Sequence, residues 1–312
     1  MNQHFLQSDA WQAFQESLGR TTFRRSGDGW SYLAILERGT GNSRLYCPFG
    51  PIASDEKHFH EALASLQELG TKLKVTFLRI GPIPPSLATS LSSRRWKSAS
   101  YIHLQPEHTR HIMLDRPEEA IVAQMAQPVR NCYRNYKKKG VTVHTSNNPQ
   151  DITLLTELIH HVAARTGLSP HSDAYFKKQA ETLLPLHAGS LWYATLNSEV
   201  IATALFFDTK DTRIYAHAAA NSTPDYRKLN AGTAILSEAI VDAKRRGMHC
   251  VDLYGVAPET ADASHPWFGF TKFKRSFGGE DVYSGQSWEL PLQPIRYQLY
   301  RLYQYIYQHI RK

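Results

Sequence analysis

Five consecutive segments in the C-terminal half of the chain limit most strongly what it can fold into. Residues 190–196, 200–208 and 212–219 read as three successive strands, bounded by turn-forming residues. A helix pattern over residues 230–246 and a further strand at 250–256 follow. Strand and amphipathic-helix patterns also alternate earlier in the chain. The sequence therefore predicts an α/β or α+β architecture.

Composition excludes several classes of protein. The chain has 312 residues, of which 42% are hydrophobic and 21% charged, so collagen-like and disordered chains are excluded. This length accommodates one large domain or two ordinary ones. No stretch approaches the roughly 18 apolar residues of a membrane span. The first residues lack the layout of a signal peptide, so we expect a cytoplasmic protein.

Cysteine and histidine give no sign of a metal centre. Cys47, Cys132 and Cys250 are far apart, which predicts neither a disulfide framework nor a cysteine-based zinc site. The fifteen histidines lack metal-ligand spacing. We expect no metal and no cofactor.

The balance of charge favours a polyanionic partner. There are 36 Lys and Arg residues against 28 Asp and Glu, a formal net charge of +8. Four cations gather on one face of a helix predicted within residues 117–140, and these are Arg130, Arg134, Lys137 and Lys138. The face is typical either of a tRNA or diphosphate patch or of an ordinary solvated surface.

The order of elements over residues 190–256 resembles the core of the GNAT acyltransferase fold. The loop before its helix reads Arg227-Lys-Leu-Asn230-Ala-Gly232, where acyl-CoA-binding loops have R/Q-x-x-G-x-G/A. Asn230 replaces the first glycine, which removes a small residue from the place where a pyrophosphate would approach. The loop is otherwise explained as a helix start with an exposed arginine.

A longer set of motifs resembles the FemABX family, aminoacyl-tRNA-dependent peptidyltransferases that build peptidoglycan cross-bridges. Asp252-Leu-Tyr254-Gly255-Val256 and the later Gly269-Phe-Thr-Lys-Phe273-Lys274-Arg-Ser-Phe-Gly278-Gly279 resemble its Y-D-x-x-G-[IV] … G-x-x-x-F-K-x-x-F-G-G signature. Five further matches occur in family order, and these are Tyr46-x-Pro48-x-Gly50-Pro51, Phe77-Leu-Arg79-Ile-Gly-Pro82, Gln105-Pro106-x-x-Thr109 with Leu114-Asp115, Arg130 through Lys139-Gly140-Val141, and Tyr226-Arg227-x-Leu229.

The resemblance implies an α+β fold of two GNAT-like domains. The first is expected over residues 1–148 and the second over 149–287, with 288–312 returning to the first as a C-terminal helix. Residues 152–184 are too short for the coiled-coil arm of longer members, so the compact form is expected. In the tail we expect Tyr303, Ile306 and Ile310 to pack on the first domain, and peripheral membrane contact is the alternative.

The resemblance also implies a reaction. An amino group of the stem peptide attacks the ester carbonyl of an aminoacyl-tRNA, and Lys274 matches the position that stabilises the oxyanion. Phe273 would shape the acceptor site, and Gly278 and Gly279 would admit close backbone approach. Asp115 matches an acidic position near the acceptor, although it also suits a turn or helix cap. The general base is left open.

Further residues are assigned to substrate binding on the same resemblance. Arg227 and Tyr254 would bind the acceptor, and Tyr254 equally suits core packing. The usual diphosphate lysine after Leu18-Gly19 is absent, so Arg24 is the expected replacement. The implied partners are aminoacyl-tRNA and either UDP-MurNAc-pentapeptide or lipid II, and we expect a monomer acting in cell wall biogenesis and cell shape.

Two other functions compete with this one. A GNAT-type N-acyltransferase would use an acyl-CoA or another carrier donor, and Asn230 argues against it. A non-catalytic module would bind RNA or the precursor with a decayed site, and the retained Lys274 argues against that.

Overall fold

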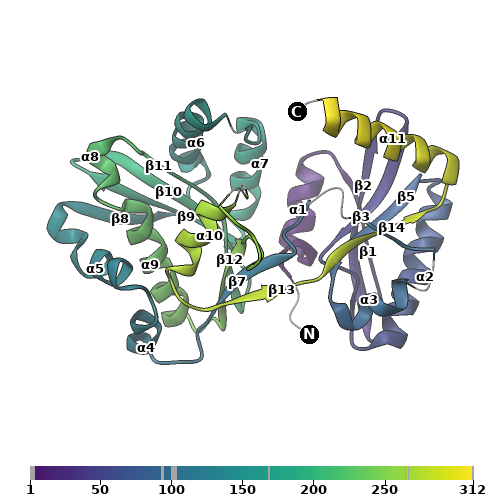
Figure 1. Ribbon diagram of the computed structural model, residues 1–312, viewed down its shortest axis with the longest axis horizontal. Coiled ribbons are helices and arrows are strands. Elements are labelled where there is room, and N and C mark those ends of the chain that lie inside the picture. Colours follow the sequence, from purple (N-terminus) through teal and green to yellow (C-terminus); the bar gives the residue numbers. More distant parts are fainter. Residues whose placement is uncertain are drawn as a thin grey trace. The chain divides into compact units, whose positions relative to one another are not determined.

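The computed structural model describes residues 4–92, 95–99, 104–167, 169–263, 265 and 267–310, with side chains up to residue 307. The chain divides into two compact units (Figure 1). Unit 1 comprises Met1–Glu107 and Tyr283–Lys312, and unit 2 comprises His108–Val282. Each unit is built on one mixed sheet with helices packed on it.

Unit 1 has a sheet of strand order β1-β2-β3-β5-β14-β6, with β4 beside β2. Its strands are β1 Thr21–Gly27, β2 Trp30–Gly39, β3 Asn42–Pro48, β4 Ile52–Ala53, β5 Phe77–Ile83, β6 Lys97–Ser98 and β14 Gln286–Pro291. Its helices are η1 Phe5–Gln7, α1 Asp9–Ser17, α2 Glu56–Lys72, α3 Pro85–Ser92 and α11 Pro294–Ile310. The core lies between the sheet and α2, whose buried face includes Phe59, Leu63 and Leu66.

Unit 2 has a sheet of strand order β13-β7-β12-β11-β10-β9-β8. Its strands are β7 His108–Met113, β8 Val141–Ser146, β9 Gly189–Leu196, β10 Glu199–Asp208, β11 Thr212–Ala220, β12 Cys250–Gly255 and β13 Glu280–Tyr283. Its helices are α4 Glu118–Ala123, α5 Gln127–Asn135, η2 Lys137–Lys139, η3 Pro149–Asp151, α6 Ile152–Thr166, α7 Asp173–Leu183, α8 Pro224–Arg227, α9 Ala231–Arg245 and α10 Phe268–Arg275. Small buried residues of α9, such as Ala234 and Ala239, let the helix lie close to the sheet.

The two units share one strand topology. In unit 1, β1, β2 and β3 are successive antiparallel strands, α2 follows, and β5 then pairs parallel to β3. In unit 2, β9, β10 and β11 are antiparallel, α9 follows, and β12 pairs parallel to β11. The fourth strand of each series, β5 or β12, also pairs with an antiparallel neighbour, β14 or β7 respectively. The chain therefore contains the same fold twice, although its sequence shows no repeat of short period.

The boundary between the units differs from the predicted one. We expected the first domain to extend to residue 148, but unit 2 begins at His108. The reason is that β7 pairs with β12, and that Ile121, Val129 and Cys132 of α4 and α5 join the hydrophobic core around α9. The second boundary lies at residues 282 and 283 rather than 287 and 288, because β14 completes the sheet of unit 1.

The C-terminal helix α11 packs on unit 1 through residues other than those predicted. Tyr297 and Tyr300 are buried against Phe77, and their ring centroids lie 5.4 and 5.0 Å, respectively, from that of Phe77. Tyr303 and Ile306 are exposed, so their predicted packing is wrong, and the side chain of Ile310 lies outside the described residues. Among the described residues, no helix is long and apolar enough to cross a membrane.

Candidate active site

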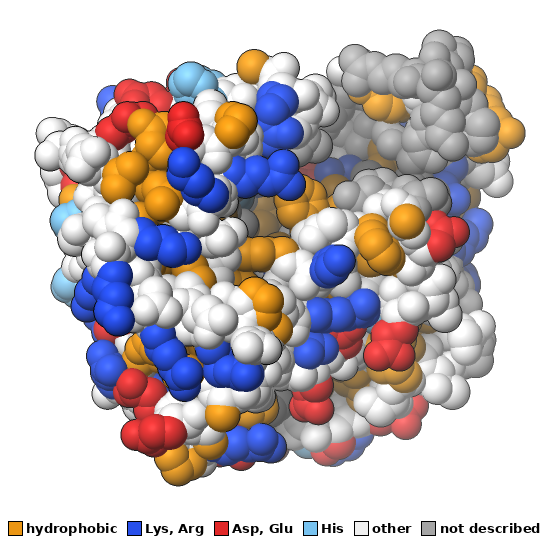
Figure 2. Space-filling model, turned by 60° about the vertical axis from the view of Figure 1, so that its left-hand side comes forward, with side chains coloured by type: hydrophobic (Ala, Val, Ile, Leu, Met, Phe, Trp, Pro, Cys, Tyr) orange, Lys and Arg blue, Asp and Glu red, His pale blue; other side chains and the backbone are white. Residues whose placement is uncertain are grey.

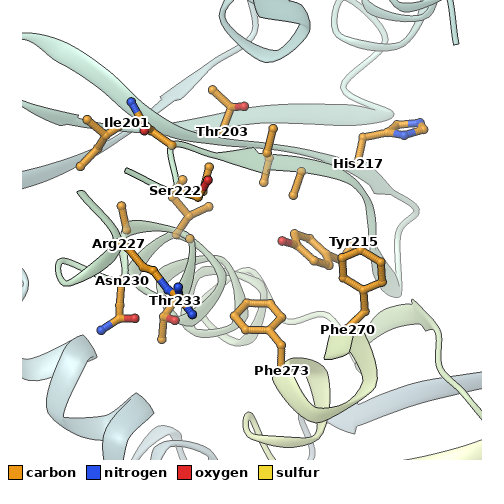
Figure 3. Close-up of a pocket in the computed structure, with 18 of the residues that line it drawn as sticks. Ile201, Thr203, Tyr215, His217, Ser222, Arg227, Asn230, Thr233, Phe270 and Phe273 are labelled. Carbon is orange, nitrogen blue, oxygen red and sulfur yellow. The ribbon is translucent and has the colours of Figure 1, made fainter. Parts of the chain in front are cut away.

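The sheet of unit 2 opens between two parallel strands. β11 pairs with β12 only from Thr212 to Ile214, although β11 continues to Ala220. At the closed end, the guanidinium of Arg213 is fully buried and donates to Asp208 Oδ1 at 2.8 Å and to Asp242 Oδ2 at 2.8 Å. Beyond this anchor the strands separate. A cavity of about 670 Å³ is bounded by β11, the end of β12, and helices α8, α9 and α10 (Figure 3).

A β-bulge shapes the wall of the cavity. Leu205 of β10 pairs with His217, but the next residue, Phe206, pairs with Tyr215. Ala216 is therefore an extra residue on β11, and such a bulge bends the strand and redirects its side chains. Tyr215 and His217 both line the cavity. In unit 1 the equivalent strands β3 and β5 stay paired from Arg44 to Pro48, through the end of β3.

Aromatic and polar side chains face one another across the cavity. Figure 3 shows Phe270 and Phe273 projecting from α10 on the side opposite Ile201 and Thr203 of β10. The hydroxyl of Thr203 is buried and has no hydrogen-bond partner among the described residues. Arg227, Asn230 and Thr233 line the cavity at the start of α9. None of the described lining residues is an aspartate or glutamate.

Lys274 is a cation at the wall of this cavity, and a hydrogen bond to the backbone fixes its position. It lies on α10, and its Nζ donates to the carbonyl oxygen of Gly255 at 2.7 Å. Burial lowers the pKa of Lys274 to about 8, although the carboxylate of Asp252 opposes this shift. A lysine with such a pKa is largely an ammonium ion at neutral pH but loses its proton in mild alkali.

The strand that carries Gly255 has an unusual backbone at Tyr254. Tyr254 has φ of +62°, a region that non-glycine residues rarely adopt, and its N–H donates to Asp252 Oδ1 at 2.7 Å. The pairing of β12 with β7 shifts by one residue at the same place. Strained residues of this kind are held by their surroundings and cluster at functional sites. Tyr254 lines the cavity, as its predicted binding role requires.

Asp252 links the cavity to β7. Its carboxylate is buried and lies 3.6 Å from Nε2 of His111. Burial opposes the charged form of His111, but the hydrogen bond and the charge of Asp252, with Glu280, hold its pKa above the ordinary value. Sequence reasoning quoted Asp252 within a motif but gave it no role. The sequence does indicate that Asp252 is paired, because an aspartate within a buried strand needs a partner for its charge.

Gly278 and Gly279 lie in the turn after α10 and do not line the cavity. Both have positive φ, +87° and +75°. A Cβ on Gly279 would lie 2.1 Å from the carbonyl oxygen of His111, and one on Gly278 would lie 2.6 Å from Gln124 Cγ. Arg110 donates to both glycine carbonyls, at 2.8 and 2.7 Å. The close approach that requires glycine is therefore to this chain's own backbone.

Asp115 lies apart from the cavity. It follows β7, and its side chain is 71% exposed. Among the described residues, its carboxylate forms an ion pair only with the neighbouring Arg116, at 3.9 Å. It is absent from the residues that line the cavity. The structure thus gives Asp115 no contact with the other predicted catalytic residue, Lys274.

The side chain of Arg24 is bonded to the N-terminal segment of unit 1. Its guanidinium donates to Gln12 Oε1 at 2.9 Å and to the carbonyl oxygen of Gln7 at 3.0 Å, and it lies 3.1 Å from Asp9. These bonds fasten β1 to the N-terminal segment. A diphosphate would have to compete with them for the guanidinium.

The four residues of the predicted basic face do not share one environment. Arg130 donates to the carbonyl oxygens of Ala123, at 3.0 Å, and Met125, so it caps the end of α4. Arg134, Lys137 and Lys138 are exposed, and the last two lie on η2 rather than on the helix itself. Figure 2 shows a face of the molecule on which Lys and Arg side chains are more widespread than acidic ones.

The sequence analysis gave no role to four aromatic residues of the cavity, Tyr215, His217, Tyr226 and Phe270. Burial, with the charge of His171, lowers the pKa of His217 to about 4, so its imidazole is neutral at physiological pH. Nothing in the local pattern distinguished His217 from other strand residues. Among the described residues, no cluster of His, Cys, Asp or Glu is arranged to hold a metal ion.

Comparison with known proteins establishes the fold. Residues 123–274 match the family model described as an acetyltransferase (GNAT) domain, a span that contains every residue lining the cavity. This match supports an acyltransferase domain. No curated protein sequence matches the chain.

Solved structures extend the likeness to both units. The crystal structure of FemX superposes with a TM-score of 0.84 at 14% identity, covering 96% of this chain and 94% of that one. The C-terminal domain of a putative lysylphosphatidylglycerol synthetase from Agrobacterium fabrum gives 0.58 at 10% identity, covering 94% and 90%. L-PGS from Bacillus licheniformis gives 0.58 at 12% identity, covering 93% and 95%. The chain has the FemX fold of two GNAT-like units, which confirms the predicted fold class.

Proposed function

We propose that this protein transfers an amino acid from aminoacyl-tRNA to an amino group on the stem peptide of a peptidoglycan precursor. The observation that carries the proposal is the half-buried ammonium of Lys274, which is held at the wall of the cavity by the carbonyl of Gly255. The likeness to FemX over 96% of the chain supports the choice of reaction. Because the donor is a charged tRNA, we propose that the protein acts in the cytoplasm.

The reaction needs a cation but no redox chemistry. The amine nitrogen attacks the ester carbonyl carbon, a C–N bond forms, and the carbonyl oxygen becomes an oxyanion. The C–O bond to the ribose then breaks, and the proton lost by the amine finally resides on the ribose oxygen. Lys274 has three N–H groups, of which one is bonded to Gly255. The other two are available for the oxyanion.

The other cavity residues are proposed to hold the substrates. Arg227 carries a charge suited to a phosphate or carboxylate, and Tyr254 and Phe273 shape the space next to Lys274. The exposed cations Arg134, Lys137 and Lys138 would contact tRNA phosphates. Since no described lining residue is a carboxylate, we propose that water or substrate accepts the proton of the amine.

The test is a transfer assay with the purified protein. Each labelled aminoacyl-tRNA is offered with UDP-MurNAc-pentapeptide and, separately, with lipid II in detergent. We expect product with at least one pair and none with deacylated tRNA plus free amino acid. If no charged tRNA gives product with either acceptor, the proposal fails.

A second candidate function is favoured by the loop before α9. Asn230 has φ of +54°, the left-handed region that glycine adopts freely and asparagine tolerates. The replacement of glycine therefore keeps a glycine-like backbone, and Ala231 and Gly232 line the cavity at the helix N-terminus. This arrangement suits the pyrophosphate of an acyl-CoA. Calorimetric titration with acetyl-CoA separates the two functions, since saturable binding without tRNA-dependent transfer would favour the N-acyltransferase.

A further inference from the structure

The C-terminal helix α11 presents an apolar stripe to solvent. Four residues form this stripe, which we call the outer stripe: Ile295, Leu299, Leu302 and Ile306. Their exposed fractions run from 43% to 76%. At about 100° per residue they fall within an arc of about 60°, and Tyr297 points to the opposite side. The helix is therefore amphipathic, but its aliphatic face points away from the unit on which it packs.

Buried hydrogen bonds fix this orientation. The hydroxyl of Tyr297 donates to Glu289 Oε2 at 2.7 Å, and Arg301 donates to that hydroxyl at 3.1 Å. Arg79 donates to the hydroxyl of Tyr300 at 3.2 Å. Turning the outer stripe inward would break these bonds around Glu289, which is fully buried. Such a loss is costly, so the stripe is a stable feature of the surface.

Charge identifies the occupant of the stripe. From Pro291 to Lys312 the chain has no aspartate or glutamate but has four cations, namely Arg296, Arg301, Arg311 and Lys312. A second copy packed stripe to stripe would bring together two segments that carry the same net charge. The net positive charge of this segment is complemented by an anionic lipid surface, to which each nearby Lys or Arg adds attraction. Arg301 contributes to that net charge, although its guanidinium is bonded to Tyr297 on the side of unit 1.

We propose that α11 binds the surface of an anionic membrane, lying in the plane of the interface with the outer stripe inserted at the headgroup boundary. The helix of 17 residues is about 25 Å long and has the composition of an interfacial helix rather than of a spanning one. Tyr303 and Tyr307, whose rings stack at 6.1 Å, border the stripe and suit the headgroup region. The proposal does not depend on the transfer reaction, because its ligand is lipid alone.

The experiment is co-sedimentation of the full chain with vesicles. Phosphatidylcholine vesicles are compared with vesicles of phosphatidylcholine and phosphatidylglycerol in equal parts. We expect binding to the anionic vesicles only, weakened by salt. Leu299→Glu should lower the partition coefficient roughly 10- to 100-fold, as expected for removing one leucine from an apolar contact. Leu186→Glu is the matched control, since Leu186 is exposed to 57% and Leu299 to 62%.

Several outcomes would overturn the proposal. One is a wild-type protein that does not bind the anionic vesicles, and another is equal binding by Leu299→Glu. A third is a dimer in analytical ultracentrifugation that Leu299→Glu dissociates, without vesicle binding, which would assign the stripe to a second copy. Thermal unfolding of both variants shows that they fold, and both positions are exposed, so neither substitution should lower the melting temperature appreciably.

Discussion

Lys274 Nζ lies 2.7 Å from the carbonyl oxygen of Gly255, so helix α10 is bonded to the end of the strand from which β11 has separated. The bond directs a cation into the opening between two parallel strands. Tyr254, the residue before Gly255, has a left-handed backbone conformation with φ of +62°. A half-buried ammonium with one N–H bonded to Gly255, and two others that have no partner in the described part of the chain, is suited to a developing negative charge.

The first prediction concerns the substitution Lys274→Met. Methionine keeps the length and apolar stem of the side chain but removes the charge. We expect transfer to slow roughly 10²- to 10³-fold, the usual loss for one oxyanion donor. The affinity for the acceptor should change little, because the contact forms mainly in the transition state.

The control is Lys272→Met on the same helix, since Lys272 is exposed and does not line the cavity. It should transfer at the wild-type rate. Wild-type turnover by Lys274→Met would remove this lysine from the mechanism.

The second prediction concerns pH. The pKa of Lys274 is lowered to about 8, so the ammonium is present below that pH and is lost as the pH rises through it. If the ammonium stabilises the oxyanion, the transfer rate should fall above about pH 8. The attacking amine must be deprotonated, so the rate should fall on the acid side as well and give a bell-shaped profile.

Single-turnover assays corrected for spontaneous ester hydrolysis measure this profile. The residual activity of Lys274→Met should lack the alkaline limb. If the rate of the wild type relative to Lys274→Met instead rises through pH 8, neutral Lys274 acts as a base and the oxyanion role is contradicted.

The elements around the cavity were predictable because their patterns are local. The strands expected at 190–196, 200–208 and 212–219 are observed within one residue, and so is the helix after them. Alternating and helical spacing decide such segments without help from the rest of the chain. Helix α10 was not predicted, because glycine and three phenylalanines obscure its helical pattern.

Features that depend on distant segments were not predictable. The unit boundary was placed late because β7 and β14 complete their sheets beside strands far away in sequence. Lys274 was selected by its motif, but its burial and its bond to Gly255 arise from tertiary packing. Asp115 was selected in the same way, and packing leaves it exposed.

The third prediction concerns tRNA binding by the exposed cations of η2 and α5. Reversing Arg134 and Lys138 to glutamate should weaken aminoacyl-tRNA binding and reduce the slope of its affinity against salt concentration. Binding of the acceptor should persist. Filter binding at several salt concentrations measures both quantities.

The matched control reverses Lys57 and Lys72, two exposed lysines of α2, and so changes the net charge equally. If both double variants lose the same affinity, net charge alone explains the effect. If tRNA affinity at low salt is unchanged in the first, Arg134 and Lys138 are only solvated.

The last prediction separates stability from catalysis at the turn after α10. Gly279→Ala places a methyl group at φ of +75° and 2.1 Å from the carbonyl oxygen of His111, so β7 or the turn must move. We expect the free energy of unfolding to fall by at least about 2 kcal/mol, from backbone strain and steric overlap together.

Gly269→Ala is the control, because nothing lies within 4 Å of its Cβ position and alanine favours a helix. Urea unfolding should leave that variant within about 1 kcal/mol of the wild type. If Gly279→Ala is as stable as Gly269→Ala but inactive, the glycine serves substrate approach rather than the approach of the turn to β7.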